Sequence, residues 1–144
     1  MVDESLLKDI KTAQDKGASA ASPEDMMRVF GFIKQVSVEN EDLKEELEDM
    51  DIAIQMVIND VDKKYWLTVK DGKLDFGEGD VENPSFTMSS TLEVGAGIMM
   101  GEVDATSAYM AGDITVEGNL QDAMAFQEII ELALEAYEDL VEDL

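Results

Sequence analysis

The spacing of apolar residues changes at Asp51, and this change constrains the fold more than any other feature of the chain. Before Asp51, apolar residues recur every three or four positions, as on one face of a helix. After it, Ile52, Ile54, Met56 and Ile58 alternate with other residues. Such alternation predicts a strand with one strongly apolar face. The chain of 144 residues, the usual size of one domain, therefore combines helices with strands.

Four further strands are expected after this one. The segment 65–70 alternates in the same way and ends at Asp71-Gly72, a dipeptide typical of a tight hairpin. A third strand is expected over 73–77 and a fourth over 85–89. A short fifth strand is expected between Gly112 and Gly118, with Ile114 and Val116 on one face.

Capping residues predict where the main helices begin. Ser22, followed by Pro23, predicts the start of a helix that runs to about Val36. Single caps are expected for three more helices at Asn40, Asp104 and Asn119. Ser90 and Glu93 have the spacing of a capping box, which predicts a helix that ends at Gly101.

The first 22 residues differ in character from the rest. Residues 5–16 predict a mostly polar helix, and Gly17–Ser22 (GASAAS) has the composition of a flexible hinge. We therefore expect residues 1–22 to form a helical appendage and hinge, followed by one domain over residues 23–144.

Charge and composition exclude several classes of function. The chain has 34 acidic and 10 basic residues, a net charge of -24, which disfavours nucleic acid and anionic membranes as partners. It has neither Cys nor His, which removes the common catalytic triads and zinc sites. We expect no enzyme activity, catalytic residue, metal or cofactor. The absence of a targeting segment or an 18-residue apolar run predicts a cytoplasmic protein without stable membrane insertion.

Three segments resemble a known family. These are YWLTVKDGKLDFGEG (65–79), PSFTMSSTLEVGAGIMMGEVDATSAYMAGDITVEGN (84–119) and the closing helix after Asn119. In the order of their elements and in their local sequence, they resemble the sterol carrier protein type-two (SCP-2) family. The resemblance extends over about Leu47 to Tyr137. The resemblance implies an α/β (α+β) fold, in which helices cover one face of a mixed five-stranded sheet. It also implies an apolar tunnel between them that binds a fatty acid, fatty acyl-CoA, sterol or isoprenoid, with transfer of this ligand within the cell as a further expectation.

The resemblance also suggests residues that line the tunnel, many of them methionines, whose flexible side chains adapt to ligands of different shape. The expected lining residues are Phe86, Met88, Leu92, Ala96, Met99, Tyr109, Met110 and Met124. Ordinary core packing is the alternative for each of them. Tyr65, Thr106 and Tyr109 are candidates to meet a polar head group.

Other patterns have simpler explanations. Gly95, Gly97 and Gly101 predict close packing or a helix end, although Gly95 to Gly97 could instead leave room for a tunnel. Glu78, Asp80 and Glu82, like Asp60 and Asp62, predict a solvated acidic surface, with weak cation binding as the alternative.

The last helix suggests an alternative function. Its apolar stripe continues through Leu140, Val141 and Leu144, so it could contact a partner, a second copy of the chain, or the mouth of the tunnel. A protein-interaction or dimerisation domain on the same fold, with no ligand, therefore stays open.

Overall fold

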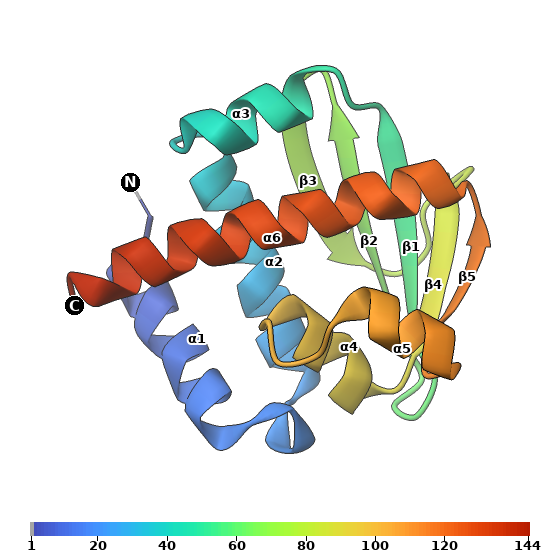
Figure 1. Cartoon of the computed structure of the whole chain (residues 1–144), viewed down its shortest axis with the longest axis horizontal. Helices are drawn as coiled ribbons and strands as arrows, with labels where there is room; N and C mark the ends of the chain where they lie inside the picture. Colours follow the sequence, from blue (N-terminus) through green and yellow to red (C-terminus); the bar gives the residue numbers. More distant parts are fainter. Residues whose placement is uncertain (1) are drawn as a thin grey trace.

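The computed structural model describes residues 2–144 and contains one five-stranded mixed sheet (Figure 1). Its strands are β1 (Ile52–Ile58), β2 (Lys63–Lys70), β3 (Lys73–Glu78), β4 (Phe86–Ser90) and β5 (Thr115–Gly118). Their order is β3-β2-β1-β4-β5. The central β1 and β4 are parallel, and the other neighbouring pairs are antiparallel. This confirms the expected five strands and the mixed sheet.

The hairpin between β2 and β3 shows why the sequence folds here as expected. Asp71 and Gly72 have φ angles of 53° and 76°. Positive φ at both central residues is typical of the type I′ turn, whose twist matches that of the flanking strands. The turn sets the register, in which Lys70 faces Lys73, and it brings Leu67 opposite Phe76.

Within residues 2–144, six α-helices accompany the sheet. They are α1 (Glu4–Lys16), α2 (Pro23–Ser37), α3 (Glu41–Glu48), α4 (Leu92–Met99), α5 (Ala105–Ala111) and α6 (Leu120–Glu142), with a short 3₁₀ helix, η1 (Ala18–Ala20), after α1. In Figure 1, the long α6 crosses in front of α2 and reaches the β4–β5 side of the sheet.

Aromatic contacts fix the helices on one face of the sheet. The Phe30 ring of α2 meets the Tyr65 ring of β2 edge-on, with centroids 5.9 Å apart. At the other end of the same face, Phe126 of α6 meets Phe86 of β4 at 6.2 Å. All four side chains are buried, so their apolar area stabilises the packing of helices on sheet.

The expected helix caps are confirmed with one correction. Ser22, Asn40, Asp104 and Asn119 each accept a backbone hydrogen bond from the first turn of their helix. The cap of α4, however, is Thr91 and not Ser90, because Ser90 is the last residue of β4. The Ser90 hydroxyl instead donates to the Thr91 carbonyl at 2.9 Å.

The N-terminal segment packs on the same core as the rest of the chain. Leu7, Ile10 and Ala13 of α1 are buried, and α1 contacts α2 and α6. Within the expected hinge, Ala18 is also buried, and its N–H donates to the Glu102 carboxylate at 2.9 Å. The boundary after residue 22 stays a prediction, but residues on both sides of it share one apolar cluster.

The glycines of α4 are packing positions, as expected, and they leave no room for a tunnel. A Cβ on Gly97 would lie 2.6 Å from Cγ2 of Val103, and one on Gly95 would lie 2.9 Å from Oγ of Ser90. The alternative that Gly95 to Gly97 open space against the sheet is therefore wrong. Their missing side chains let the strand end and the following loop approach α4 closely.

Candidate ligand-binding cavity

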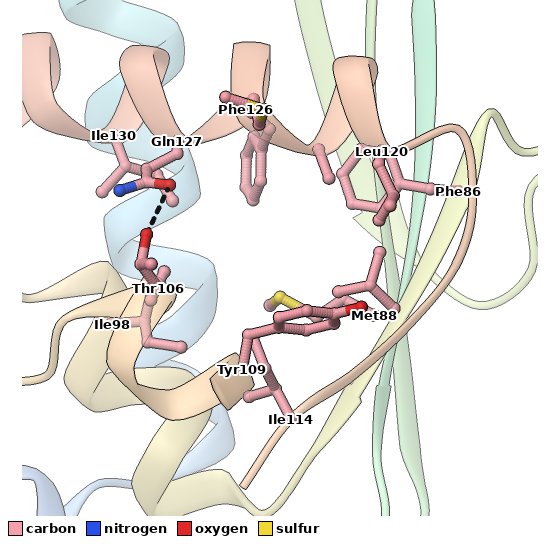
Figure 2. A pocket seen from close by; sticks show the side chains of 14 residues that line it. Phe86, Met88, Ile98, Thr106, Tyr109, Ile114, Leu120, Phe126, Gln127 and Ile130 are labelled. Carbon is pink, nitrogen blue, oxygen red and sulfur yellow. Dashed lines mark hydrogen bonds between the residues drawn. The ribbon is translucent and has the colours of Figure 1, made fainter. Parts of the chain in front are cut away.

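A cavity of about 280 Å³ lies between α5, α6 and the β4–β5 edge of the sheet (Figure 2). This is near the lower end of the volume range of small-molecule sites. Its lining is almost entirely apolar. The lining residues are Phe86, Met88, Ile98, Ala105, Thr106, Tyr109, Ile114, Val116, Leu120, Ala123, Met124, Phe126, Gln127 and Ile130.

Half of the expected tunnel residues meet at this cavity. Phe86 and Met88 extend from β4, Tyr109 from α5 and Met124 from α6. The other four lie elsewhere: Met110 is 82% exposed on α5, whereas Leu92, Ala96 and Met99 are buried in the core outside the cavity lining. Of the eight predicted lining residues, these first four therefore line this cavity.

The sequence interpretation did not single out most of the α6 contribution. Leu120, Ala123, Met124 and Gln127 are spaced i, i+3, i+4 and i+7, which is one face of a helix. That spacing was a usable signal, but Gln127 interrupts its apolar character. Ile114 and Val116, expected on one face of the fifth strand, also line the cavity.

Two aromatic rings, Phe86 of β4 and Phe126 of α6, form one side of the cavity. Phe86 and Phe126 are buried, and their planes are tilted by 50°. Figure 2 shows Tyr109 and Met88 on the opposite side of the same space. A ligand there would contact carbon and sulfur atoms on several sides, which suits a hydrocarbon chain and offers little to a polar molecule.

Polar groups gather at one end of the cavity. The Thr106 hydroxyl donates to Oε1 of Gln127 at 3.5 Å, and Nε2 of Gln127 donates to Glu131 at 3.4 Å (Figure 2 shows the first contact). Both distances are long, so these hydrogen bonds are weak. The hydroxyl and the amide can therefore exchange them for bonds to a ligand.

Tyr65, the remaining head-group candidate, lies away from the cavity. It is buried on β2, and its hydroxyl donates to the Pro23 carbonyl at 3.4 Å. Burial, and then the nearby charges of Glu78 and Glu24, raise its pKa. Its role in the structure is to join the sheet to the start of α2.

The mouth of the cavity is apolar and open to water. Tyr109 is 47% exposed, Leu120 52% and Met124 68%, although all three line the cavity. Exposed large apolar side chains around an opening are typical of an entry route for an apolar ligand. We call Tyr109, Leu120 and Met124 the rim.

The acidic clusters do not form a metal site within the part of the chain that the structure describes. Glu78 pairs with Lys63 at 3.1 Å, and Asp80 pairs with Lys64 at 3.3 Å. The Asp60 carboxylate accepts a hydrogen bond from the N–H of Leu92. These carboxylates therefore have structural partners on or beside the sheet.

The clearest pKa shifts lie away from the cavity lining. Burial, and secondarily Asp15, raise the pKa of Tyr137 to about 12. A hydrogen bond that protonated Glu46 of α3 donates to Glu128 of α6, together with burial, raises the pKa of Glu46. Neither pairs a general acid with a base in an enclosed site, which catalysis by two carboxylates would need. Among residues 2–144, no helix has both the length and the apolar character needed to cross a membrane.

The fold and its apolar cavity define a lipid-binding class of protein, and a sequence comparison identifies the family. Residues 32–131 match the SCP-2 sterol transfer family, and the chain belongs to that family. Membership supports lipid binding or transfer in general terms. No curated protein sequence matches the chain significantly.

Solved structures share the fold at low sequence identity. The sterol carrier protein domain 2 of Helicoverpa armigera is 18% identical, with a TM-score of 0.64, over 80% of this chain and 94% of that one. Palmitated SCP2L2 from Aedes aegypti is 18% identical, with a TM-score of 0.56, over 71% and 90%.

The fold also occurs as a small part of an enzyme. The sec-alkylsulfatase Pisa1 from Pseudomonas sp. is 19% identical, with a TM-score of 0.54, over 62% of this chain. The match spans only 14% of the sulfatase. The likeness therefore concerns the fold of that part and not the sulfatase reaction.

Proposed function

We propose that the chain binds one lipid-like molecule, with its hydrocarbon chain in the cavity between α5, α6 and the β4–β5 edge. The observation that carries this proposal is the apolar lining of a space of about 280 Å³, open at an apolar rim. At about 30 Å³ per water-sized group, the space holds about nine such groups. Nine methylene groups contribute about 7 kcal/mol before ordering costs, at about 0.8 kcal/mol each.

The ligand classes that the family suggests are a fatty acid, a fatty acyl-CoA, a sterol or an isoprenoid. The palmitate of the Aedes aegypti relative is an example of an acyl chain on this fold. We propose a carrier without enzymatic activity that acts in the cytoplasm and delivers its ligand without inserting into the membrane. Its acidic surface disfavours nucleic acid as a partner.

A variant that fills the cavity tests the proposal. Ala123 lines the cavity from α6, so Ala123→Trp should place an indole ring in the space that the lipid needs. Gln121→Trp is the matched control, because Gln121 is exposed on the same helix and does not line the cavity. Native mass spectrometry, followed by organic extraction, measures the ligand retained by the unmodified chain and by each variant.

One retained lipid per chain, lost in Ala123→Trp and kept in Gln121→Trp, is the expected result. Equal retention in both variants would place the ligand elsewhere. A chain that retains no ligand and takes up neither fatty acids, acyl-CoA, long-chain alcohols nor sterols would instead favour the interaction domain.

The protein-interaction alternative has one observation in its favour. Met110, next to the rim, is 82% exposed, which is unusual for a large apolar side chain. The apolar stripe of α6 supports it less, because Tyr137 is buried and Leu140 and Val141 pack against the core. Light scattering of the purified chain would detect a homodimer directly.

A further inference from the structure

The charges of the chain are distributed very unevenly with respect to the cavity. All ten Lys and Arg residues lie at or before Lys73, whereas seventeen Asp and Glu residues follow it. Every residue that lines the cavity falls between Phe86 and Ile130. The cavity is therefore built entirely from a part of the chain that has no basic residue.

Basic residues of the sheet do not compensate for this. Lys63 and Lys64 lie in β2, which is separated from β4 by β1. Two strand spacings are about 10 Å, comparable to the distance over which salt screens charges in the cell. Both lysines are also engaged, at 3.1 Å by Glu78 and at 3.3 Å by Asp80.

The polar end of the cavity faces carboxylates. A second hollow, of about 340 Å³, adjoins the cavity and shares Gln127 and Ile130 with it. Glu102, Asp104 and Glu131 line this hollow, and all three are exposed. Hydrogen bonds from Ser107 lower the pKa of Asp104, so its carboxyl group is ionised at neutral pH.

Gln127 lies between the two spaces. Its Oε1 accepts from Thr106 on the cavity side, and its Nε2 donates to Glu131 at 3.4 Å on the side of the hollow. A lipid head group beside Thr106 and Gln127 would therefore meet a hydroxyl, an amide and then a negative charge. The residues that line the two spaces offer it no positive charge.

We infer that the cavity selects amphiphiles whose head group carries no negative charge, such as long-chain alcohols and amines, over carboxylates of equal length. The inference rests on the proposed lipid-binding function and narrows its ligand class. A carboxylate here would lose water, find no cation and face Glu131, which is unfavourable on each count. A hydroxyl needs only the hydrogen bonds that Thr106 and Gln127 supply, and an ammonium is attracted by the carboxylates.

Three ligands with the same decyl chain isolate the effect of the head group on affinity. Isothermal titration calorimetry with decanol, decylamine and decanoate gives a Kd for each on the full chain. At low ionic strength, decanoate should bind at least tenfold more weakly than decanol or decylamine. The ratio of the decanoate Kd to the decanol Kd should fall as salt rises from about 0.02 M to about 0.5 M, because salt screens the repulsion between decanoate and the carboxylates of the protein.

One substitution should reverse the selectivity. Gln127 is half-buried on α6, so a flexible side chain is accommodated there. Gln127→Lys should tighten decanoate and lower the ratio of the decanoate Kd to the decanol Kd at least tenfold, since lysine adds a cation at the polar end. Gln127→Met, which has similar length and no charge, should keep the selectivity of the unmodified chain.

The outcomes separate this inference from the proposed function. Decanoate binding as tightly as decanol at low salt, or a Gln127→Lys variant without effect on decanoate, would overturn the charge selectivity and leave lipid binding intact. Failure of all three ligands to bind would instead count against the proposed function. Binding of decanol and decylamine with decanoate excluded is the result that supports both.

Discussion

Ile10 tests whether the N-terminal helix is part of the domain or an appendage to it. Its side chain is 4% exposed, and it meets α2 and α6 near Val29, Phe32 and Tyr137. Truncating a buried Ile to Ala costs about 2–5 kcal/mol through lost burial and the cavity left behind. We expect Ile10→Ala to lower the free energy of unfolding by about 3 kcal/mol, and Tm by about 6–12 °C for a chain of this size.

Urea unfolding followed by circular dichroism measures this effect. A lower midpoint with an unchanged slope indicates lost stability within one cooperative unit. Lys11→Ala is the control, because Lys11 follows in the same helix and is exposed, and its contact with Asp15 at 4.0 Å is a surface ion pair worth little. If the free energies of unfolding of Ile10→Ala and Lys11→Ala differ by less than about 0.5 kcal/mol, α1 contributes nothing to the core. The prediction that residues 1–22 form an appendage would then be correct.

Two further substitutions test the β5 connection and the interior of the helical layer. A Cβ on Gly118, at φ 115°, would lie 2.5 Å from the Ser85 carbonyl oxygen, so Gly118→Ala should cost about 3 kcal/mol or more in urea unfolding. Gly112→Ala, where the same atom meets nothing within 4 Å, should cost only about 1–2 kcal/mol, and equal losses would contradict the argument. Tyr137 has a pKa of about 12, above its unfolded value of 10.0, so the folded state keeps a proton that the unfolded state releases, and stability should fall between pH 10 and 12. Tyr137→Phe should remove that part of the loss, and identical pH profiles of the two proteins would refute it.

The strands and most helix starts could be predicted because their signals are local. Alternation fixes which residues of β1 face the core, and Asp71-Gly72 fixes the hairpin. The parallel pairing of β1 with β4 is a different matter. It joins Ile54 to Phe86 across 32 positions, and no residue near either strand specifies that neighbour.

Elsewhere, tertiary contacts decide features that a local pattern does not. Ser90 has the spacing of a cap, but the ladder with β1 extends through it and moves the cap to Thr91. α1 has a mostly polar sequence, yet three apolar positions on one face suffice to dock it. Tyr109 and Met110 are adjacent on a seven-residue helix, so sequence alone could not decide which of them faces the cavity.

The cavity exists because small side chains lie where α5 and α6 approach each other. Ala105 and Ala123 line it from the two helices, whereas the larger side chain of Met110 lies outside. At about 24 cal/mol per Å³, an empty space of 280 Å³ would cost up to about 7 kcal/mol, an upper limit because water reaches the rim. That is comparable to the whole stability of an ordinary domain. A bound hydrocarbon chain restores the missing contacts, so ligand binding should stabilise the fold in proportion to RT ln(1 + [L]/Kd). The free energy of unfolding and the affinity for a ligand should therefore both depend on how this cavity is filled.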